Sequence, residues 1–261
     1  MVHVGRSFGS LASGEVVHRH ILGFPEGLQV QIMTLGATIT SVRVPDVNGQ
    51  VGEVTLGFDE VRPYHDGTSP YFGCVAGRVA NRICRGSFVI GGTQYSLATN
   101  NGPNHLHGGV VGFDKRIWSV ASYSETSLTL TLDSADGEEG YPGNVIATVK
   151  YSLPTATTLR IEYSATTDAP TPINLTNHTY WNLKATRVAS HVARHPRWLG
   201  ARDCIMTCRL SVLCVSWPRY RMVGRPRFLS TSSSCQQIFT YRSTIRPSRW
   251  ARFGQSVAQW I

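Results

Sequence analysis

One histidine, His178, stands in a segment with many groups that could handle protons and hydroxyls. The segment runs from Asn174 to Leu183 and reads Asn-Leu-Thr-Asn-His-Thr-Tyr-Trp-Asn-Leu. An imidazole titrates near neutral pH, and the neighbouring amides and hydroxyls can donate to or accept from sugar hydroxyls. This pattern indicates acid/base chemistry on a carbohydrate, with His178 as the proton carrier. The alternative is a structural histidine that bonds a loop carbonyl.

Four other stretches of sequence combine polar and aromatic groups between predicted strands. Binding groups are often carried by loops on a rigid scaffold, so we expect these stretches to contribute to the same site. They are Tyr71–Gly73, Gly77–Arg82, Asn104–Gly109 and Asp136–Gly143.

Two other chemistries fit single features of these loops. His105 and His107 alternate as two metal ligands can, but the neighbouring sequence supplies no further ligands, so we expect no metal site. Glu138 and Glu139 could be the paired carboxylates of a glycosidase. Such enzymes need carboxyls on opposite sides of the scissile bond, whereas adjacent residues in a segment rich in Gly and Pro are typical of a turn.

The elements that must position these loops are short strands. Residues 127–133 alternate polar and apolar, which predicts a strand with Leu128, Leu130 and Leu132 on one buried face. Residues 88–90 and 94–97 flank Gly91-Gly92-Thr93, a pattern typical of a β-hairpin because glycine tolerates the positive φ of a tight turn.

A second hairpin is predicted from residues 145–153 and 158–164, in which Leu159, Ile161 and Tyr163 repeat the period of two. Further strands are predicted at residues 28–34, 38–44 and 53–58. No amphipathic helix of normal length interrupts these strands. The predicted fold class is therefore all-β, a large antiparallel β-sandwich.

Charge divides the chain into two parts. The net charge is +9, but 14 of the 25 Lys and Arg residues lie in residues 184–261, where Asp203 is the only acid. Residues 184–261 therefore carry +13 and residues 1–183 carry −4. The apolar runs of the second part have no evident period, and it is too rich in Trp and Cys for a usual basic arm or linker.

These differences predict two units: residues 1–183 form the sandwich, and residues 184–261 form an aberrant, Arg-rich, poorly ordered tail. We interpret the tail as translated out of frame or from a misjoined exon. The alternative is a genuine basic extension that binds a partner.

Compartment and redox state follow from what the sequence lacks. The chain opens without a secretory apolar segment and contains no run of about 18 apolar residues, so a cytoplasmic protein without a membrane span is predicted. Cys74 and Cys84 are too few for a disulfide framework, and Cys204 and Cys208 lack a second ligand pair for zinc. We expect free thiols.

Four motifs together resemble the aldose 1-epimerase family, also called galactose mutarotase. They are GRVANR, LHGG followed by GFDK, DGEEGYPG, and NLTNHTYWNL, and the resemblance runs from about Leu22 to Leu183. The resemblance implies a large β-sandwich of the galactose mutarotase-like type. It also implies an enzyme that interconverts the α and β anomers of free aldohexoses such as glucose and galactose, without a metal or organic cofactor.

The resemblance also implies roles for four residues. His178 would be the acid that protonates the ring oxygen, and His107 would hydrogen-bond the ring-oxygen side. Asn81 and Arg82 would hold sugar hydroxyls through their amide and guanidinium donors. The alternatives are a structural His107 and an Arg82 that makes a surface ion pair.

The chain departs from the family after Leu183. The family's general base is a glutamate and a sugar-binding aspartate also contributes, but no Glu follows Glu162 and the surroundings of Asp203 match no family motif. The sandwich is therefore predicted to be incomplete at the C-terminus, with strand edges left open, and the epimerase activity is predicted to be impaired.

Two other function classes stay open at this point. A non-catalytic carbohydrate-binding relative would keep the sugar contacts without the base. An adaptor would use the +13 segment to bind nucleic acid or an anionic membrane, although free Arg excess alone gives only non-specific adsorption, so no specific nucleic-acid partner is expected. The sequence determines neither the preferred hexose nor the oligomeric state.

Overall fold

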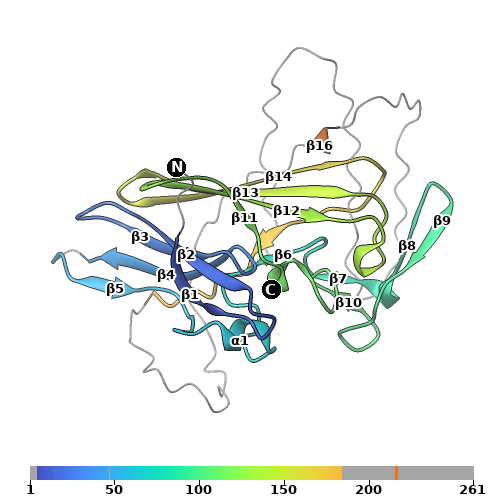
Figure 1. The fold of residues 1–261 in the computed structure, drawn as a ribbon, viewed down its shortest axis with the longest axis horizontal. Coiled ribbons are helices and arrows are strands. Elements are labelled where there is room, and N and C mark those ends of the chain that lie inside the picture. Colours follow the sequence, from blue (N-terminus) through green and yellow to red (C-terminus); the bar gives the residue numbers. More distant parts are fainter. Residues whose placement is uncertain (1–4, 47, 184–214, 217–261) are drawn as a thin grey trace.

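A computed structural model describes residues 5–46, 48–183 and 215–216. Its first large sheet has five strands in chain order, and each pairs antiparallel with the next (Figure 1). The strands are β1 (Arg6–Ser10), β2 (Val16–Gly23), β3 (Gln29–Met33), β4 (Thr38–Pro45) and β5 (Val51–Glu53).

The second large sheet also has five strands. β11, β12, β13 and β14 pair antiparallel, and the last strand, β16, pairs parallel with β14. The bounds are β11 (Ser119–Ser124), β12 (Ser127–Ser134), β13 (Val145–Thr155), β14 (Thr158–Thr167) and β16 (Val215–Ser216).

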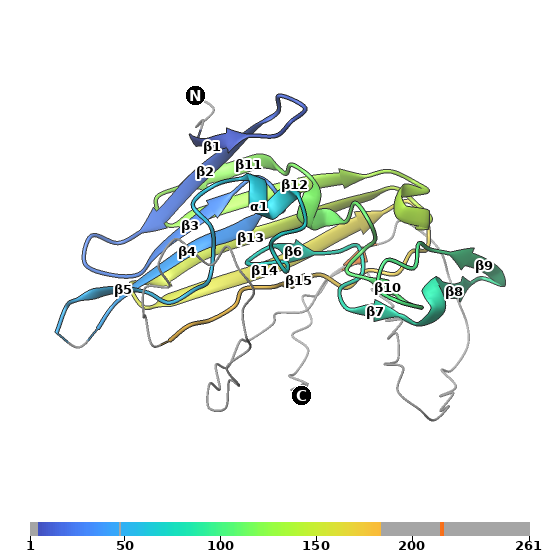
Figure 2. The ribbon, with the colours of Figure 1, turned by 90° about the horizontal axis from the view of Figure 1, so that it is seen from below.

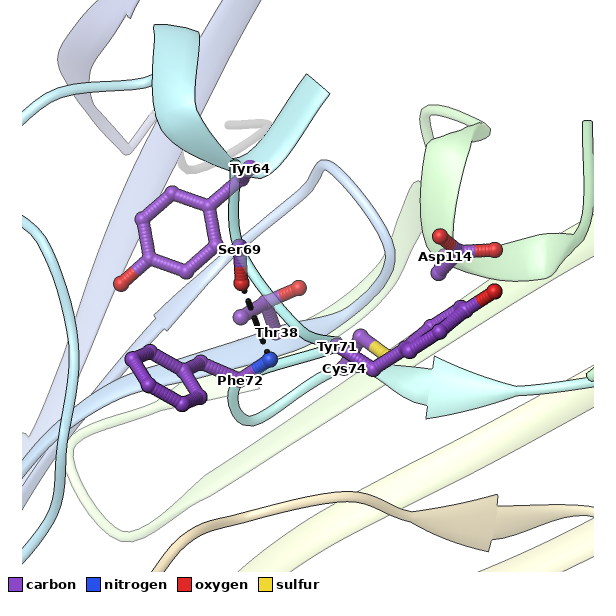
Figure 3. A pocket seen from close by; sticks show the side chains of 7 residues that line it. All are labelled: Thr38, Tyr64, Ser69, Tyr71, Phe72, Cys74 and Asp114. Carbon is purple, nitrogen blue, oxygen red and sulfur yellow. Dashed lines mark hydrogen bonds between the residues drawn. The ribbon is translucent and has the colours of Figure 1, made fainter. Parts of the chain in front are cut away.

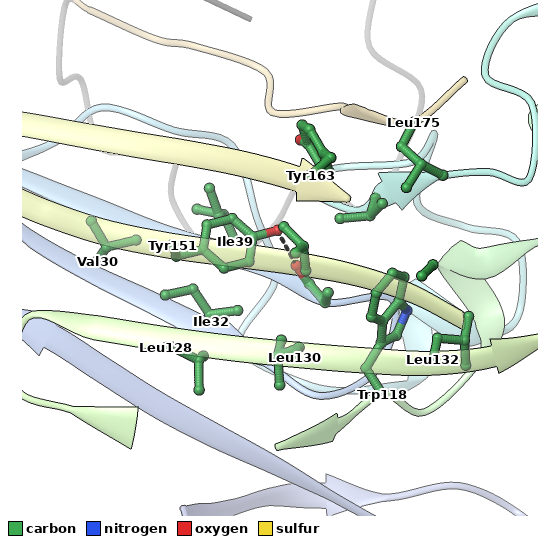
Figure 4. Packing of buried hydrophobic residues seen from close by; sticks show 14 of the residues in the cluster. Val30, Ile32, Ile39, Trp118, Leu128, Leu130, Leu132, Tyr151, Tyr163 and Leu175 are labelled. Carbon is green, nitrogen blue, oxygen red and sulfur yellow. Dashed lines mark hydrogen bonds between the residues drawn. The ribbon is translucent and has the colours of Figure 1, made fainter. Parts of the chain in front are cut away.

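The main core lies between these two sheets, which overlie each other (Figure 2). Ile32 and Ile39 of the first sheet and Leu128 and Leu130 of the second are fully buried in one cluster, and their side chains share one layer (Figure 4). Tyr151 of β13 adds a polar link, because its hydroxyl donates to the Ala37 carbonyl at 2.7 Å. Apolar burial from both faces therefore holds the sandwich together.

Short elements connect the sheets and carry the loops. One helical turn, α1 (Arg62–His65), and three 3₁₀ turns are the helical elements of the described residues. The 3₁₀ turns are Cys84–Gly86, Phe113–Lys115 and Glu138–Gly140. The short strands are β6 (Val75–Ala76), β7 (Arg82–Ile83), β8 (Ser87–Ile90), β9 (Thr93–Ser96), β10 (His105–Leu106) and β15 (Thr176–Asn177).

The predicted all-β sandwich is confirmed, and so are both hairpins. β8 and β9 meet at a two-residue turn in which Gly91 and Gly92 both have positive φ, 59° and 84°. β13 and β14 pair over their length, and alternate residues of β12 are buried as the period of two predicts.

The predicted strand at residues 53–58 is wrong in its bounds. β5 ends at Glu53, whose carboxylate accepts from the Thr55 amide and from the Thr55 hydroxyl. Beyond Glu53, the Val54 amide donates to Val42 O of β4 and Leu56 N donates to Tyr180 O, both at 2.9 Å. The extended segment thus pairs with the segment that carries His178.

The predicted tail lies outside the described residues except for β16. Within the described ranges, no helix is long and apolar enough to cross a membrane.

Candidate active site

The β7–β10 ladder brings two of the predicted site loops together. It places Arg82 opposite Leu106, so that Asn81 and His107 follow as the next pair. The His107 amide donates to the Asn81 carbonyl at 3.0 Å, and the Asn81 amide donates to Nδ1 of His107 at 2.9 Å. Because Nδ1 accepts a hydrogen bond, the neutral His107 ring carries its proton on Nε2.

The β15–β6 ladder brings in the third loop. It pairs Asn177 with Val75, and the flanking backbone continues the contact. His178 N donates to Cys74 O at 2.8 Å, and Gly73 N donates to His178 O at 3.1 Å. The backbone of His178 is therefore held on both sides by residues 73 and 74.

The two predicted catalytic histidines face each other. Their ring centroids are 5.0 Å apart and their planes are perpendicular. Tyr71 contacts both rings, at 4.6 Å from His107 and 5.7 Å from His178. Tyr180 stacks on His178 at 5.2 Å. Two imidazoles from loops 71 residues apart thus share one aromatic cluster, and both are only partly buried.

Burial keeps His107 neutral. It lowers the pKa of His107 from its ordinary value to about 4, with smaller contributions in the same direction from His178 and Arg82. His107 is therefore an uncharged hydrogen-bond donor at pH 7.

The electrostatic surroundings of His178 differ from those of His107. Burial lowers its pKa, but a backbone hydrogen bond and the Asp114 carboxylate act in the opposite direction. A negative charge thus faces His178, whereas the guanidinium of Arg82 faces His107. Of the two rings, His178 has the surroundings that better tolerate a proton.

Asn81 and Arg82 lie beside His107. Arg82 is exposed, and its Nε donates to Asn101 Oδ1 at 2.9 Å while a terminal nitrogen donates to Asn81 Oδ1 at 3.3 Å. No carboxylate of the described residues forms an ion pair with Arg82. The remaining guanidinium hydrogens can therefore bind a hydroxylated ligand.

Three side chains of this cluster stand on left-handed backbone. Tyr71, Asn81 and His107 have φ of 65°, 63° and 52°. Such values are uncommon for residues other than glycine and cost on the order of 1–3 kcal/mol each, and they concentrate at functional sites. The backbone strain and the imidazole pair thus coincide.

Sequence reasoning assigned no role to four residues of this neighbourhood. Tyr71 and Tyr180 contact the imidazoles, and Asp114 pairs with Lys115 at 2.7 Å beneath Tyr71. The signals were present, because Tyr71 opens one of the polar stretches and Asp114-Lys115 lies in the GFDK motif. Only the fold shows that they reach the histidines.

Glu138 and Glu139 have structural partners. The Glu139 carboxylate accepts from the amides of Val110 and Val111 at 3.0 and 2.8 Å, and Glu138 pairs with Arg116. Both carboxylates are thus engaged at the turn, as the alternative to the glycosidase interpretation predicts.

His105 is buried and its two ring nitrogens both have partners. Nδ1 contacts Ala98 O at 2.8 Å, and Nε2 contacts the Tyr141 hydroxyl at 2.7 Å. It cannot form a metal pair with His107 without losing these contacts. Within the described ranges, no group of three or more His, Cys, Asp or Glu side chains could hold a metal ion.

Comparison with known proteins identifies the family of the chain. A family model described as aldose 1-epimerase matches residues 19–197. The chain belongs to the aldose 1-epimerase family. The matched range starts three residues before Leu22 and ends 14 residues after Leu183, within the part of the chain that was predicted to be the tail.

Relatives in this family are similar over about half of their length. A galactose mutarotase from Sus scrofa is 46% identical over 184 residues, which cover 70% of this chain and 53% of that protein. An aldose 1-epimerase from Escherichia coli is 41% identical over 157 residues, covering 60% and 45%. The chain thus spans about half the length of the curated relatives that it matches.

Solved structures give the same result for the fold. The aldose epimerase homologue from C. elegans superposes with a TM-score of 0.59 at 33% identity, over 64% of this chain and 51% of that one. A galactose 1-epimerase from Lactobacillus acidophilus gives 0.58 at 28% identity, over 67% and 51%.

Proposed function

We propose that this chain binds a free aldohexose at the His107–His178 cluster, and that the cluster is built for the aldose 1-epimerase reaction, which interconverts α and β anomers. One observation carries the proposal. Two imidazoles in different electrostatic surroundings face each other at 5.0 Å, with amide and guanidinium donors beside one of them. Glucose and galactose are the proposed substrates.

In this proposal His178 is the acid. It transfers a proton to the ring oxygen as the C1–O5 bond breaks, and the aldehyde forms when a base takes the proton of the anomeric hydroxyl. Rotation about C1–C2 and the reverse proton transfers then close the ring on the other face. His107, neutral and protonated on Nε2, donates a hydrogen bond on the ring-oxygen side.

Asn81 and Arg82 hold the sugar in place. The Arg82 guanidinium is fixed by Asn101 and Asn81 and is exposed, so binding costs little additional ordering of its side chain. Acid/base ring opening of this kind requires neither a metal nor an organic cofactor.

The base is the weak point of the proposed reaction. Asp114 is buried and paired with Lys115, and Glu139 accepts two backbone amides, so both carboxylates already have structural partners. Residues 184–261 contain no Glu. We therefore propose that residues 1–183 are the family portion of the chain and that turnover is impaired. This observation also favours the second candidate, sugar binding without anomer exchange.

Two measurements on the full chain separate these possibilities. Polarimetry follows the relaxation of α-D-glucose and α-D-galactose, and a His178→Gln variant serves as the control for buffer catalysis. Sugar binding is followed by the histidine NMR resonances. Binding without accelerated relaxation supports impaired turnover, relaxation well above that of His178→Gln contradicts it, and the absence of both contradicts the sugar site.

The location of the protein and an adaptor role are two further expectations from the sequence. The cytoplasmic location stays a prediction. The nucleic-acid or membrane adaptor depends on residues that lie, except for β16, outside the described part of the chain.

A further inference from the structure

Tyr71 lies between the imidazole pair and a buried ion pair. Its ring contacts His107 and His178, and Lys115 Nζ lies 5.4 Å from the ring centroid. Lys115 in turn donates to Asp114 Oδ2 at 2.7 Å. A continuous series of contacts therefore leads from the carboxylate to both histidines.

The Asp114 carboxylate is unusual in its surroundings. Its exposed fraction is 7%, and Oδ1 has no hydrogen-bond partner among the described residues. It lines a pocket of about 10 Å³ together with Tyr71 and Cys74, and the phenol end of Tyr71 points toward it (Figure 3). A pocket of this size has room for about one water molecule, which would satisfy Oδ1.

Burial of a carboxylate is costly for folding, so the position of Asp114 calls for an explanation. Lys115 compensates only one oxygen. The position of the pair directly behind Tyr71 supplies the explanation, because the cation holds the aromatic face and the carboxylate projects its negative charge toward His178.

We propose that Tyr71, Asp114 and Lys115 are positioning residues, which together hold His107 and His178 perpendicular to each other and direct the mobile proton to His178. This inference rests on the proposed function, because the three residues hold the imidazoles of the proposed site. None of the three needs to touch the sugar.

The charges around the two imidazoles are consistent with this assignment. Asp114 faces His178 from the 3₁₀ turn Phe113–Lys115, and Arg82 faces His107 from β7. The other titratable groups packed against the pair are Tyr71, Tyr180 and Lys115. Asp114 thus places a negative charge near His178, and it is not among the groups that shift the pKa of His107.

The experiment is a pH titration of the histidine ring resonances by NMR, on the full chain and without sugar. It therefore succeeds or fails independently of sugar binding and turnover. Asp114→Asn removes the charge and keeps the shape, Tyr71→Leu removes the ring, and Tyr71→Phe keeps it. Asp66→Asn is the matched control, because Asp66 forms an exposed ion pair with Arg62 at 3.3 Å and does not contribute to the pKa of His107 or His178.

His105 provides an internal check of folding, since its two ring contacts depend on the intact β10 loop. With the His105 resonance unchanged, Asp114→Asn is expected to lower the pKa of His178, because it removes a negative charge that favours the protonated ring. The pKa of His107 is expected to stay the same.

The Tyr71 variants test the ring. Tyr71→Leu admits water and should raise the pKa of both His107 and His178, because burial is the main cause that lowers them. Tyr71→Phe should match the unaltered chain. The proposal is overturned if Asp114→Asn leaves His178 unchanged, if it abolishes the His105 resonance and so proves a folding element, or if Tyr71→Phe behaves as Tyr71→Leu.

Discussion

The interior of the sandwich and the loops around His107 are stabilised in different ways. The interior joins long ladders such as β13–β14 with side chains that are fully buried, among them Leu130 and Val149. The site rests on ladders of two residues and on individual polar contacts, such as the Asn81–His107 pair. Burial of apolar surface stabilises the interior, whereas individual hydrogen bonds of defined geometry hold the site loops in place.

The difference matters for how each region responds to change. A core side chain contributes through its volume, so its removal weakens the whole sandwich. A site residue on left-handed backbone contributes through the orientation of its side chain. Its replacement therefore changes the chemistry of the site and has a smaller effect on the free energy of unfolding. Four substitutions test this contrast.

The largest effect is expected in the core. Leu130→Ala removes a side chain with 0% exposure and should lower the free energy of unfolding by about 2–5 kcal/mol. Ile146→Ala is the control, because Ile146 is 51% exposed on β13 of the same sheet and should cost less than about 0.5 kcal/mol. Urea unfolding measures both. Equal losses of stability in the two variants would contradict the expectation that buried side-chain volume determines the effect.

Arg78 connects the two regions and should give the next largest effect. It is 1% exposed, and it lies three residues before Asn81 in the chain. Its guanidinium donates to six acceptor atoms: Pro142 O, Gly143 O, Thr171 Oγ1, Ala135 O and the Ser134 backbone and hydroxyl oxygens.

Arg78→Met leaves these acceptors without a donor and should cost about 2–3 kcal/mol. Arg78→Lys keeps the charge and should recover part of the loss. Thermal unfolding measures stability, and the NMR resonances of His107 report whether the site loop moves as well. A destabilised Arg78→Met with an unchanged His107 would show that the two regions are independent.

Arg82 should affect binding more than folding. Arg82→Met keeps the length of an exposed side chain and loses the donors, so sugar affinity should fall roughly tenfold, about 1.4 kcal/mol. Its free energy of unfolding should change by less than about 0.5 kcal/mol. Titration with galactose and urea unfolding provide the two numbers. A loss of stability without a loss of affinity would assign Arg82 to the fold.

The smallest effect concerns pH. The folded pKa of His107 is about 4, below its ordinary value, so between about pH 6.5 and pH 4 the unfolded chain binds a proton that the folded chain does not. Stability should therefore fall as the pH falls through this window, by about 1 kcal/mol from pH 6.5 to pH 5 after allowance for solvent screening.

His107→Asn removes this contribution, because asparagine does not titrate and tolerates the left-handed backbone at this position. Urea unfolding at both pH values should show a weaker pH dependence for the variant. An identical pH dependence would mean that the other buried histidines account for it.

The sequence predicted the regular region well and the site only in outline. Leu128 and Leu132 are buried as alternation predicts, because a period of two is a local property of the chain. The strand predicted at residues 53–58 has the wrong bounds, since the bond from Val42 N to the Glu53 carboxylate and the bond from Leu56 N to Tyr180 O join residues distant in sequence.

The candidate site shows the same limit. Family motifs named His107 and His178, and the structure brings them together. The same motifs gave no role to Tyr71 or Asp114, because their importance arises from packing between a loop and a 3₁₀ turn that no local pattern specifies. Burial and orientation are properties of the assembled fold.

The amide of Asn81 fixes more than the tilt of an imidazole. By occupying Nδ1 of His107, it commits Nε2 to donating, so whatever meets that nitrogen must offer a lone pair. An ether oxygen or a fluorine substituent satisfies this demand, whereas the charged ammonium of an amino sugar would set one hydrogen against another. In the proposed sugar site, this single backbone N–H thus disfavours a cationic amino group at His107 Nε2, in the same sense as the nearby positive charge of Arg82.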